Sequence, residues 1–266
     1  MAILNSFFNS KLFDNLHKFL AKKIFKFKKY FFVETKFKNL PILNYPLNEK
    51  HFDFPGENSA LTNDKPYLSY SHLPDLLSII YKENNKISFL DYGAANLNLY
   101  YYLDKKFENF KYYFVDQEII KKKVDEIIQE KKFNNIFLKE IEHINEKLDM
   151  VYFGSSLQYL ENYKNCLIKC CKKTRYILIS QLPVFFNSNL SDTIVMKQLN
   201  MHPEINYLYL FNFEPLVTFL NKNNYNLVEK NINKVTKFLN FKNFDKNKYK
   251  DINMYDLLFE YKHEKK

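Results

Sequence analysis

The chain has 266 residues, and 46% of them are hydrophobic, enough for one large domain or for one domain with an extension. Its formal net charge is +10, but a single arginine stands beside 39 lysines among the 40 basic residues, so bidentate reading of guanine or phosphate, and with it specific nucleic-acid recognition, is nearly excluded. No run of about 18 uncharged apolar residues occurs, which argues against a membrane-spanning helix.

Cysteine usage and the first residues bear on the compartment. The three cysteines (Cys166, Cys170 and Cys171) are clustered and odd in number, so they form neither a disulfide framework nor a paired zinc motif, and no metal site is expected. Residues 1–8 lack lysine and arginine, which argues against a secretory signal. We therefore expect helix-borne thiols in a reducing compartment, and a cytoplasmic protein.

Residues 1–38 carry most of the charge, because they hold nine lysines and two acidic residues, which gives +7 of the total +10. Apolar residues spaced by three or four alternate with lysines over 3–32, which predicts one or two amphipathic helices. Such a helix packs its apolar side on the domain or lies on an anionic membrane surface, and the pattern leaves both open. We expect residues 1–50 to form a basic N-terminal extension and residues 51–266 to form the main domain.

From residue 74 onward, apolar runs alternate with helix-like stretches. Pro74 opens a helix-like stretch after the irregular segment 40–70. Strand-like runs are 87–91, 111–115, 135–138, 148–153 and 175–180; helix-like stretches are 96–106, 117–131 and 158–173; a helix at 214–221 and strands at 225–229 and 254–261 follow. Buried strands with helical crossovers predict an α/β fold with a doubly wound, mostly parallel sheet of about seven strands, to which the basic helical extension is attached. The segment 183–212 is interpreted as a long irregular piece that forms a substrate lid.

The chain has only three glycines, against about 19 expected at an average usage of about 7%. Gly93 and Gly154 each follow a strand-like run, where a parallel sheet lets a ligand approach the carboxyl ends of its strands. The segment from Gly93 to Asn96 is a turn of small residues before a helix start, which offers N–H groups to a carboxylate or phosphate. Asp116 ends the next strand and is placed to bind a ribose diol or to cap the following helix.

Four pieces of sequence at the predicted strand ends match the motifs of a known family. They are Leu90-Asp91-Tyr92-Gly93, Phe114-Val115-Asp116-Gln117, Ser155-Ser156-Leu157-Gln158-Tyr159-Leu160 and Ile179-Ser180-Gln181-Leu182-Pro183-Val184-Phe185. Over roughly residues 60–262 the chain resembles the class I S-adenosylmethionine-dependent methyltransferases, most closely a group of bacterial enzymes found among cell-surface polysaccharide genes. Two positions depart from the family pattern. Alanines follow Gly93 where further glycines are usual, which predicts ordinary backbone angles or a looser cofactor contact, and Gln181 stands where an arginine is expected.

The resemblance implies an S-adenosylmethionine cofactor and methyl transfer to a small-molecule or glycan acceptor, such as a hydroxyl of a surface-polysaccharide precursor. It implies cofactor contacts at Asp91, Gly93, Ala94, Ala95, Asn96, Asp116, Gln117, Gly154 and Ser155, with the adenine near 140–142. It implies substrate contacts at Gln158, Gln181 and Tyr207. His202 is the candidate general base, with His143 and Asp192 as further candidates, and each is also explained as a structural or exposed residue.

Some alternatives remain open from the sequence. Tyr207, Tyr209 and Phe211 stack on a sugar ring or pack as a strand on the domain. The protein as a whole is an enzyme or a catalytically inactive binding protein with the same fold. A nicotinamide-dependent oxidoreductase is disfavoured because the second and third fingerprint glycines are missing.

Overall fold

The computed structural model describes residues 10–16, 30–35, 37–41, 72–190, 193–201, 204–233, 239–241 and 244–262. The helices are α4 (Leu73–Asn84), α5 (Asn98–Lys106), α6 (Glu118–Lys131), α7 (Tyr163–Cys171) and α8 (Phe213–Lys222), with short 3-10 helices η2 (Ile141–His143) and η3 (Leu157–Tyr159). The strands are β1 (Tyr30–Glu34), β2 (Ile87–Tyr92), β3 (Phe110–Val115), β4 (Ile136–Phe137), β5 (Leu148–Gly154), β6 (Thr174–Phe186), β7 (Ile194–Met201), β8 (Glu204–Asn212), β9 (Tyr225–Ile232), β10 (Leu239–Asn240) and β11 (Lys250–Tyr261).

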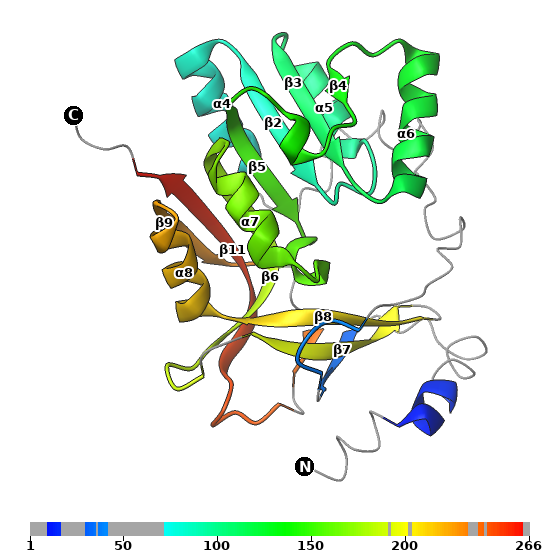
Figure 1. The fold of residues 1–266 in the computed structure, drawn as a ribbon, viewed down its shortest axis with the longest axis vertical. Helices are drawn as coiled ribbons and strands as arrows, with labels where there is room; N and C mark the ends of the chain where they lie inside the picture. Colours follow the sequence, from blue (N-terminus) through cyan, green and yellow to red (C-terminus); the bar gives the residue numbers. More distant parts are fainter. Residues whose placement is uncertain are drawn as a thin grey trace.

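Seven of these strands form the main sheet, in the order β4-β3-β2-β5-β6-β11-β9 (Figure 1). Strands β4, β3, β2, β5 and β6 are mutually parallel, while β11 runs antiparallel to both of its neighbours. The chain order reverses between β2 and β5, which is the switch point where open α/β sheets bind ligands. The predicted doubly wound, mostly parallel sheet is therefore confirmed.

Helices cover both faces of this sheet because its strands are apolar on both sides. One core layer joins α4, α5 and α6 to side chains such as Phe89 and Tyr112 of β2 and β3. The opposite layer joins α7 and α8 to side chains such as Phe153 and Ile177 of β5 and β6. The three cysteines of α7 are free thiols buried in this second layer, as expected for helix-borne core residues.

Residues 183–212 are mostly regular structure, so the expectation of a long irregular piece is wrong. Strand β6 continues to Phe186, and its distal end pairs in parallel with β8. From there β8, β7, β1 and β10 extend the sheet sideways, with β7 antiparallel to both β8 and β1 (Figure 1). Residues 194–201 mix apolar residues with Lys197, Gln198 and Asn200, so a search for long apolar runs misses this strand. Strand β8, in contrast, contains the uninterrupted apolar run 207–211, which was an available strand signal. We call β8, β7, β1 and β10 the side sheet.

The N-terminal region is only partly helical. Residues 11–16 form a short helix, whereas Tyr30–Glu34 form β1, so the prediction of helix up to residue 32 is wrong at its end. Phe32 and Val33 are completely buried, and tertiary packing of these aromatic and β-branched residues outweighs the helical spacing. In the described part of the chain, no helix has the length and apolarity needed to cross a membrane.

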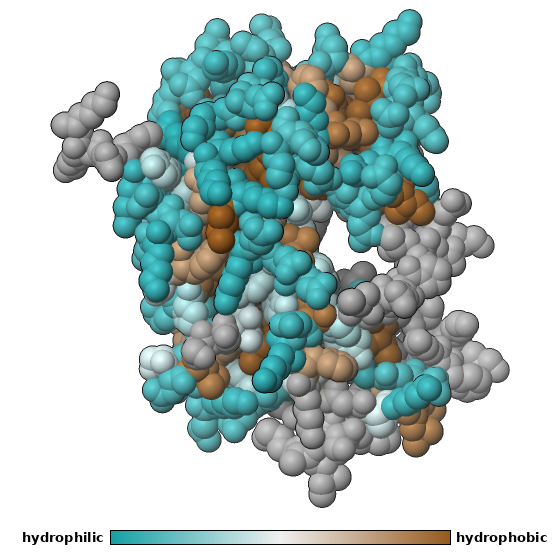
Figure 2. Space-filling view, viewed as in Figure 1, coloured by the Kyte–Doolittle hydropathy of each residue, from teal (hydrophilic) through white to brown (hydrophobic). Residues whose placement is uncertain are grey.

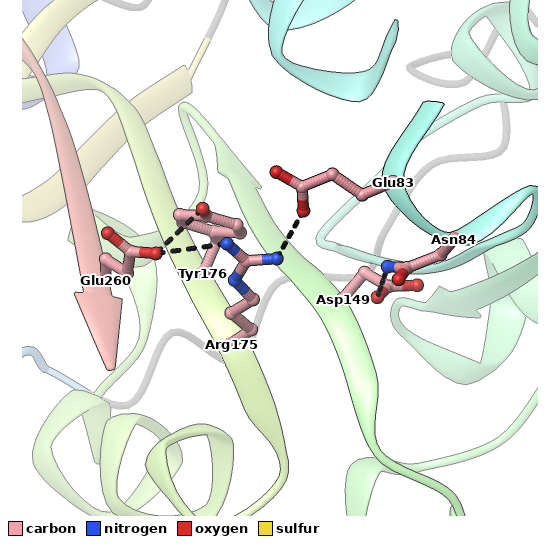
Figure 3. Close-up of polar contacts among 6 residues, drawn as sticks. All are labelled: Glu83, Asn84, Asp149, Arg175, Tyr176 and Glu260. Atoms are coloured by element: carbon pink, nitrogen blue, oxygen red, sulfur yellow. Dashed lines mark hydrogen bonds and ion pairs between the residues drawn. The ribbon is translucent and has the colours of Figure 1, made fainter. Parts of the chain in front are cut away.

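The single arginine lies at the amino end of the main sheet (Figure 3). Arg175, at the start of β6, donates to Glu83 of α4 at 2.7 Å and to Glu260 of β11 at 3.3 Å. Tyr176 donates its hydroxyl to the same Glu260 at 2.8 Å. A planar guanidinium reaches two carboxylates on different elements, a geometry that the point charge of lysine does not match.

Candidate functional site

The carboxyl ends of three adjacent strands share an unusual backbone feature. Four residues there have a positive φ: Gly93 (74°) and Ala95 (59°) after β2, Ser155 (62°) after β5, and Gln181 (53°) within β6. Only one of the four is glycine, although side chains make this conformation costly. Such backbone strain concentrates at functional sites, because the surrounding structure must hold it.

Gly93 is required where the turn after β2 meets the loop after β5. A Cβ atom added to Gly93 would lie 2.5 Å from Cβ of Ser156. Ser156 in turn donates its hydroxyl to the backbone carbonyl of Tyr92. The space beside this glycine is therefore taken by protein atoms, and the glycine serves the contact between two strand ends.

Asp116 ties the turn to the end of β3. Its Oδ2 accepts the N–H of Ala95 at 2.8 Å and its Oδ1 accepts the N–H of Gln117 at 2.7 Å. Burial raises the pKa of the Asp116 carboxyl, and these two N–H bonds oppose the rise. Of the two alternatives predicted for this turn, ordinary backbone angles are wrong, because Ala95 adopts the left-handed region. In this conformation Ala95 makes its hydrogen bond to Asp116.

The other members of the turn form the start of α5. Asn96 donates its N–H to the carbonyl of Ala94 at 2.6 Å, and its side-chain Oδ1 accepts the N–H of Asn98 at 2.9 Å. An asparagine side chain in this role stabilises a tight turn into a helix. The chain thus builds a compact strand–turn–helix unit with one glycine where several are common.

Asp91 is the buried carboxylate of the site. It is 4% exposed, and its Oδ2 accepts the hydroxyl of Tyr112 at 2.6 Å. Burial raises the pKa of Asp91 to about 7, the Tyr112 bond opposes this rise, and the nearby charge of Asp116 adds to it. A carboxyl with this pKa binds a cation or a proton readily near neutrality.

Gly154 and Ser155 lie at the end of β5, as predicted. A Cβ on Gly154 would lie 2.8 Å from the ring of Tyr152, so this glycine makes room for a core aromatic side chain. The N–H of Ser155 donates to the carbonyl of Ser180 at 3.0 Å, which joins the ends of β5 and β6. Both glycines singled out in the sequence are thus explained by contacts within the protein.

Gln158 has one end of its amide satisfied and the other unsatisfied. The side chain is 1% exposed, and Nε2 donates to Ser155 Oγ at 3.0 Å and to the carbonyl of Gln181 at 3.5 Å. Because the backbone carbonyl of Gln181 can only accept, the amide atom that contacts it is the nitrogen Nε2. The oxygen Oε1 therefore points away from these two contacts. Among the described residues Oε1 of Gln158 has no hydrogen-bond partner, and a buried acceptor without a partner calls for a ligand or water.

Asp256 of β11 belongs to the same edge, and sequence reasoning missed it. Its Oδ1 accepts the N–H of Gln181 at 2.9 Å, and both of its oxygens accept from Nδ2 of Asn233 at 2.9 Å. Burial raises the pKa of Asp256, and these bonds oppose the rise. An aspartate within the apolar stretch 254–259 of the final strand was the available signal.

The segment 140–142, where the adenine is expected, is held by lysines. Glu140 accepts from Lys121 of α6 at 2.9 Å, and Glu142 pairs with Lys169 of α7. Ile141 is buried in the core beneath α7. Lys173 donates to the carbonyls of Ile141 and Glu142 at 2.7 and 3.0 Å, which fixes the backbone of η2.

The remaining predicted residues are less closely grouped. Tyr207 lies on β8 of the side sheet, opposite Lys197, and packs edge to face on Phe37. His143 is exposed at the end of η2, while His202 and Asp192 lie outside the described residues. Within the described ranges, no group of three or more His, Cys, Asp or Glu side chains is arranged to hold a metal ion.

Tyr209 and Phe211 are buried, and their rings pack edge to face on Tyr163 of α7. Of the two roles predicted for these residues, they pack β8 on the domain and do not stack on a sugar.

Figure 2 shows a hollow between the part of the molecule that carries β2, β3 and α6 and the part that carries β7 and β8. Strands β2, β3 and β5 run toward this side, so their carboxyl ends face the side sheet (Figure 1). The carboxyl ends of these strands therefore point toward the side of the molecule that carries this hollow.

Comparison with known proteins bears on the fold alone. No protein-family model matches the sequence, and no curated protein matches it. Among solved structures, the N-terminal domain of EvdMO1 with S-adenosylhomocysteine (SAH) bound is 9% identical, covers 77% of this chain and 85% of its own, and has a TM-score of 0.50. An S-adenosylmethionine-dependent methyltransferase from Clostridium acetobutylicum ATCC 824 is 14% identical, covers 71% of this chain and 90% of its own, and has a TM-score of 0.45. Together with the strand order, the first of these similarities shows that the chain has a Rossmann-like α/β fold.

Proposed function

We propose that the protein is an S-adenosylmethionine-dependent methyltransferase that acts on a small-molecule or glycan acceptor. The observation that carries this proposal is the pair of acids Asp91 and Asp116. Asp91 lies near the end of β2, just before the turn, and accepts the hydroxyl of Tyr112, while Asp116 follows β3 and accepts the N–H of Ala95 in that turn. In an open α/β sheet this is the position of a bound nucleoside.

The residues at the strand ends fit the cofactor group by group. Asp91 is a buried carboxylate suited to an ammonium group. The N-terminus of α5, which follows the 93–96 turn, suits a carboxylate. Asp116 retains lone pairs for a ribose diol after accepting two N–H bonds, with Gln117 beside it at the start of α6. Gly154 and Ser155 form the wall toward the acceptor, and the 140–142 segment lies beyond β4 for the adenine.

When bound, S-adenosylmethionine supplies an activated methyl group, so this chain has mainly to align the acceptor. Gln158 Oε1 accepts a hydrogen bond from a hydroxyl or amine of the acceptor and thereby orients its lone pair. Gln181 and Tyr207 contact the rest of the acceptor, and His202 removes its proton. A hydroxyl of a surface-polysaccharide precursor fits this set of polar contacts. We place the protein in the cytoplasm and propose peripheral membrane contact through residues 1–38.

The test is calorimetric titration of the purified chain with SAH. We expect binding by the natural chain, a loss of at least tenfold in affinity for Asp116→Ala, and no change for Asp125→Ala. Asp125 is a matched control, because it lies exposed on α6 and accepts only from Gln129 of the same helix. Absence of heat at millimolar SAH contradicts the proposal.

Mass spectrometry of the native protein separates the two versions of this function. A co-purified S-adenosyl compound together with a methylated product supports the enzyme. Cofactor binding with no methylated product from any acceptor supports the catalytically inactive binding protein.

A further inference from the structure

The helix formed by residues 11–16 packs against the side sheet through one face only. Phe13 packs near Val33 and Ile205, and its ring lies 5.8 Å from Nζ of Lys197. Asp14 forms an ion pair with Lys197, whose side chain is completely buried on β7. These contacts fix which face of the helix points inward.

The outward face of this helix carries two leucines beside the polar Lys11 and Asn15. Leu12 and Leu16, one turn apart, are 71% and 45% exposed. Phe37 is 49% exposed and packs edge to face on Tyr207, which, like Phe13 of the helix, packs on the Val33 and Ile205 cluster. Figure 2 shows hydrophobic side chains at the surface of the helix that Figure 1 draws in dark blue. We call Leu12, Leu16 and Phe37 the apolar edge.

The charge around the apolar edge is positive, because both acids of residues 1–38 are used by the body of the protein. Asp14 pairs with Lys197, and Glu34 pairs with Lys248 at 3.0 Å and accepts the hydroxyl of Tyr249. Lys11 and Lys38 stand exposed next to the apolar edge.

We propose that the apolar edge docks on an anionic lipid surface. Leucine and phenylalanine side chains enter the boundary between headgroups and acyl chains, while lysines stay at the level of the anionic headgroups. Attraction of lysines to such a surface adds to the burial of the apolar side chains. A nucleic acid fits less well, because exposed leucines gain nothing from phosphate and residues 1–38 contain no arginine. This inference does not depend on the proposed methyl transfer.

The experiment is co-sedimentation of the full chain with vesicles of phosphatidylglycerol and phosphatidylcholine, compared with phosphatidylcholine alone. We expect binding to the anionic vesicles only, and weaker binding as salt is raised. The double variant Leu12→Ser/Leu16→Ser should bind at least tenfold more weakly. The control Ile79→Ser, at a 55% exposed position on α4, should bind as the natural chain does.

A second variant keeps the test decisive if the serine variant unfolds. Lys11→Glu/Lys38→Glu should reduce binding to the anionic vesicles and leave SAH titration unchanged. Equal binding of both double variants and the natural chain overturns the proposal. So does equal binding to the two vesicle types, retention on duplex DNA that exceeds vesicle binding, or a serine variant that loses only self-association in gel filtration.

Discussion

Ala95 donates its backbone N–H to Asp116 Oδ2 over 2.8 Å while its own φ is 59°, so a strained alanine of the site makes a bond between the turn after β2 and the end of β3. For an alanine the left-handed region costs about 1–2 kcal/mol, whereas glycine adopts it freely. The turn therefore stores strain that a single substitution can release.

Ala95→Gly should raise the free energy of unfolding by about 0.5–1 kcal/mol, since relief of strain exceeds the added chain entropy of glycine. Ala94→Gly is the matched control, because Ala94 is not among the described residues with positive φ. The control should lose about 0.4–1 kcal/mol. Urea denaturation of both variants measures this, and equal losses in the two contradict the strain.

Gly93 and Ser156 should be energetically coupled. Gly93→Ala adds a Cβ at 2.5 Å from Cβ of Ser156 and forces alanine to a φ of 74°, so we expect a large loss of stability. Removing the opposing atom with Ser156→Gly should restore part of it, giving a coupling energy above about 1 kcal/mol in a double-mutant cycle. Additive effects of the two substitutions would show that the strand ends are farther apart than the structure has them.

Much of the fold follows from the sequence, because apolar runs such as 87–91 and 148–153 form central strands and can be recognised without knowing which strands they pair with. The side sheet follows less directly, since β7 interrupts its apolar residues with Lys197 and Gln198, and these strands gain stability by pairing with each other and with β6. Likewise, the spacing of apolar residues leading into β1 predicts a helix, and only the pairing of β1 with β7 explains why these residues form a strand.

The sequence predicted where the acidic residues of the site lie but did not predict the backbone conformation of the site. Asp91 and Asp116 are found at strand ends as expected, because a parallel sheet brings these ends together. The left-handed conformations of Ala95, Ser155 and Gln181 could not be read from residue types that avoid them. Asp256 was missed because its partner Gln181 lies 75 residues earlier in the chain.

Cofactor affinity should depend on pH through Asp91. Its pKa is raised to about 7 by burial, so the carboxyl is mostly protonated below that pH and cannot pair with an ammonium group. We expect SAH affinity to rise about tenfold per pH unit from pH 5 toward 7 and then to level off. Titration at several pH values tests this, and Asp91→Asn should bind weakly at each of them.

The same carboxyl should affect stability with the opposite sign. Because the pKa is higher in the folded state than its ordinary value of 3.8, the folded protein holds the proton more tightly, and Asp91 opposes folding increasingly as pH rises from about 4 to 7. Asp91→Asn removes this penalty, so it should gain stability relative to the natural chain at pH 8 and not at pH 4. Melting temperatures at the two pH values measure the difference. A variant less stable at pH 8 than at pH 4, relative to the natural chain, contradicts the assignment.

Substitution of Arg175 should change the stability of the protein without affecting the candidate site. Its two carboxylate partners, Glu83 and Glu260, are both partly exposed, so solvent screening limits the contribution of the network (Figure 3). Arg175→Lys should lower the free energy of unfolding by about 1 kcal/mol, since an ammonium group cannot bond to both carboxylates in the geometry of the fork. Glu83→Gln should cost less in the lysine background than in the natural chain, because the bond it removes is already weakened. SAH affinity should not change, since Arg175 lies at the amino end of β6, the edge of the main sheet opposite the site. A tenfold loss of affinity in Arg175→Lys would place the cofactor at this amino edge of the sheet.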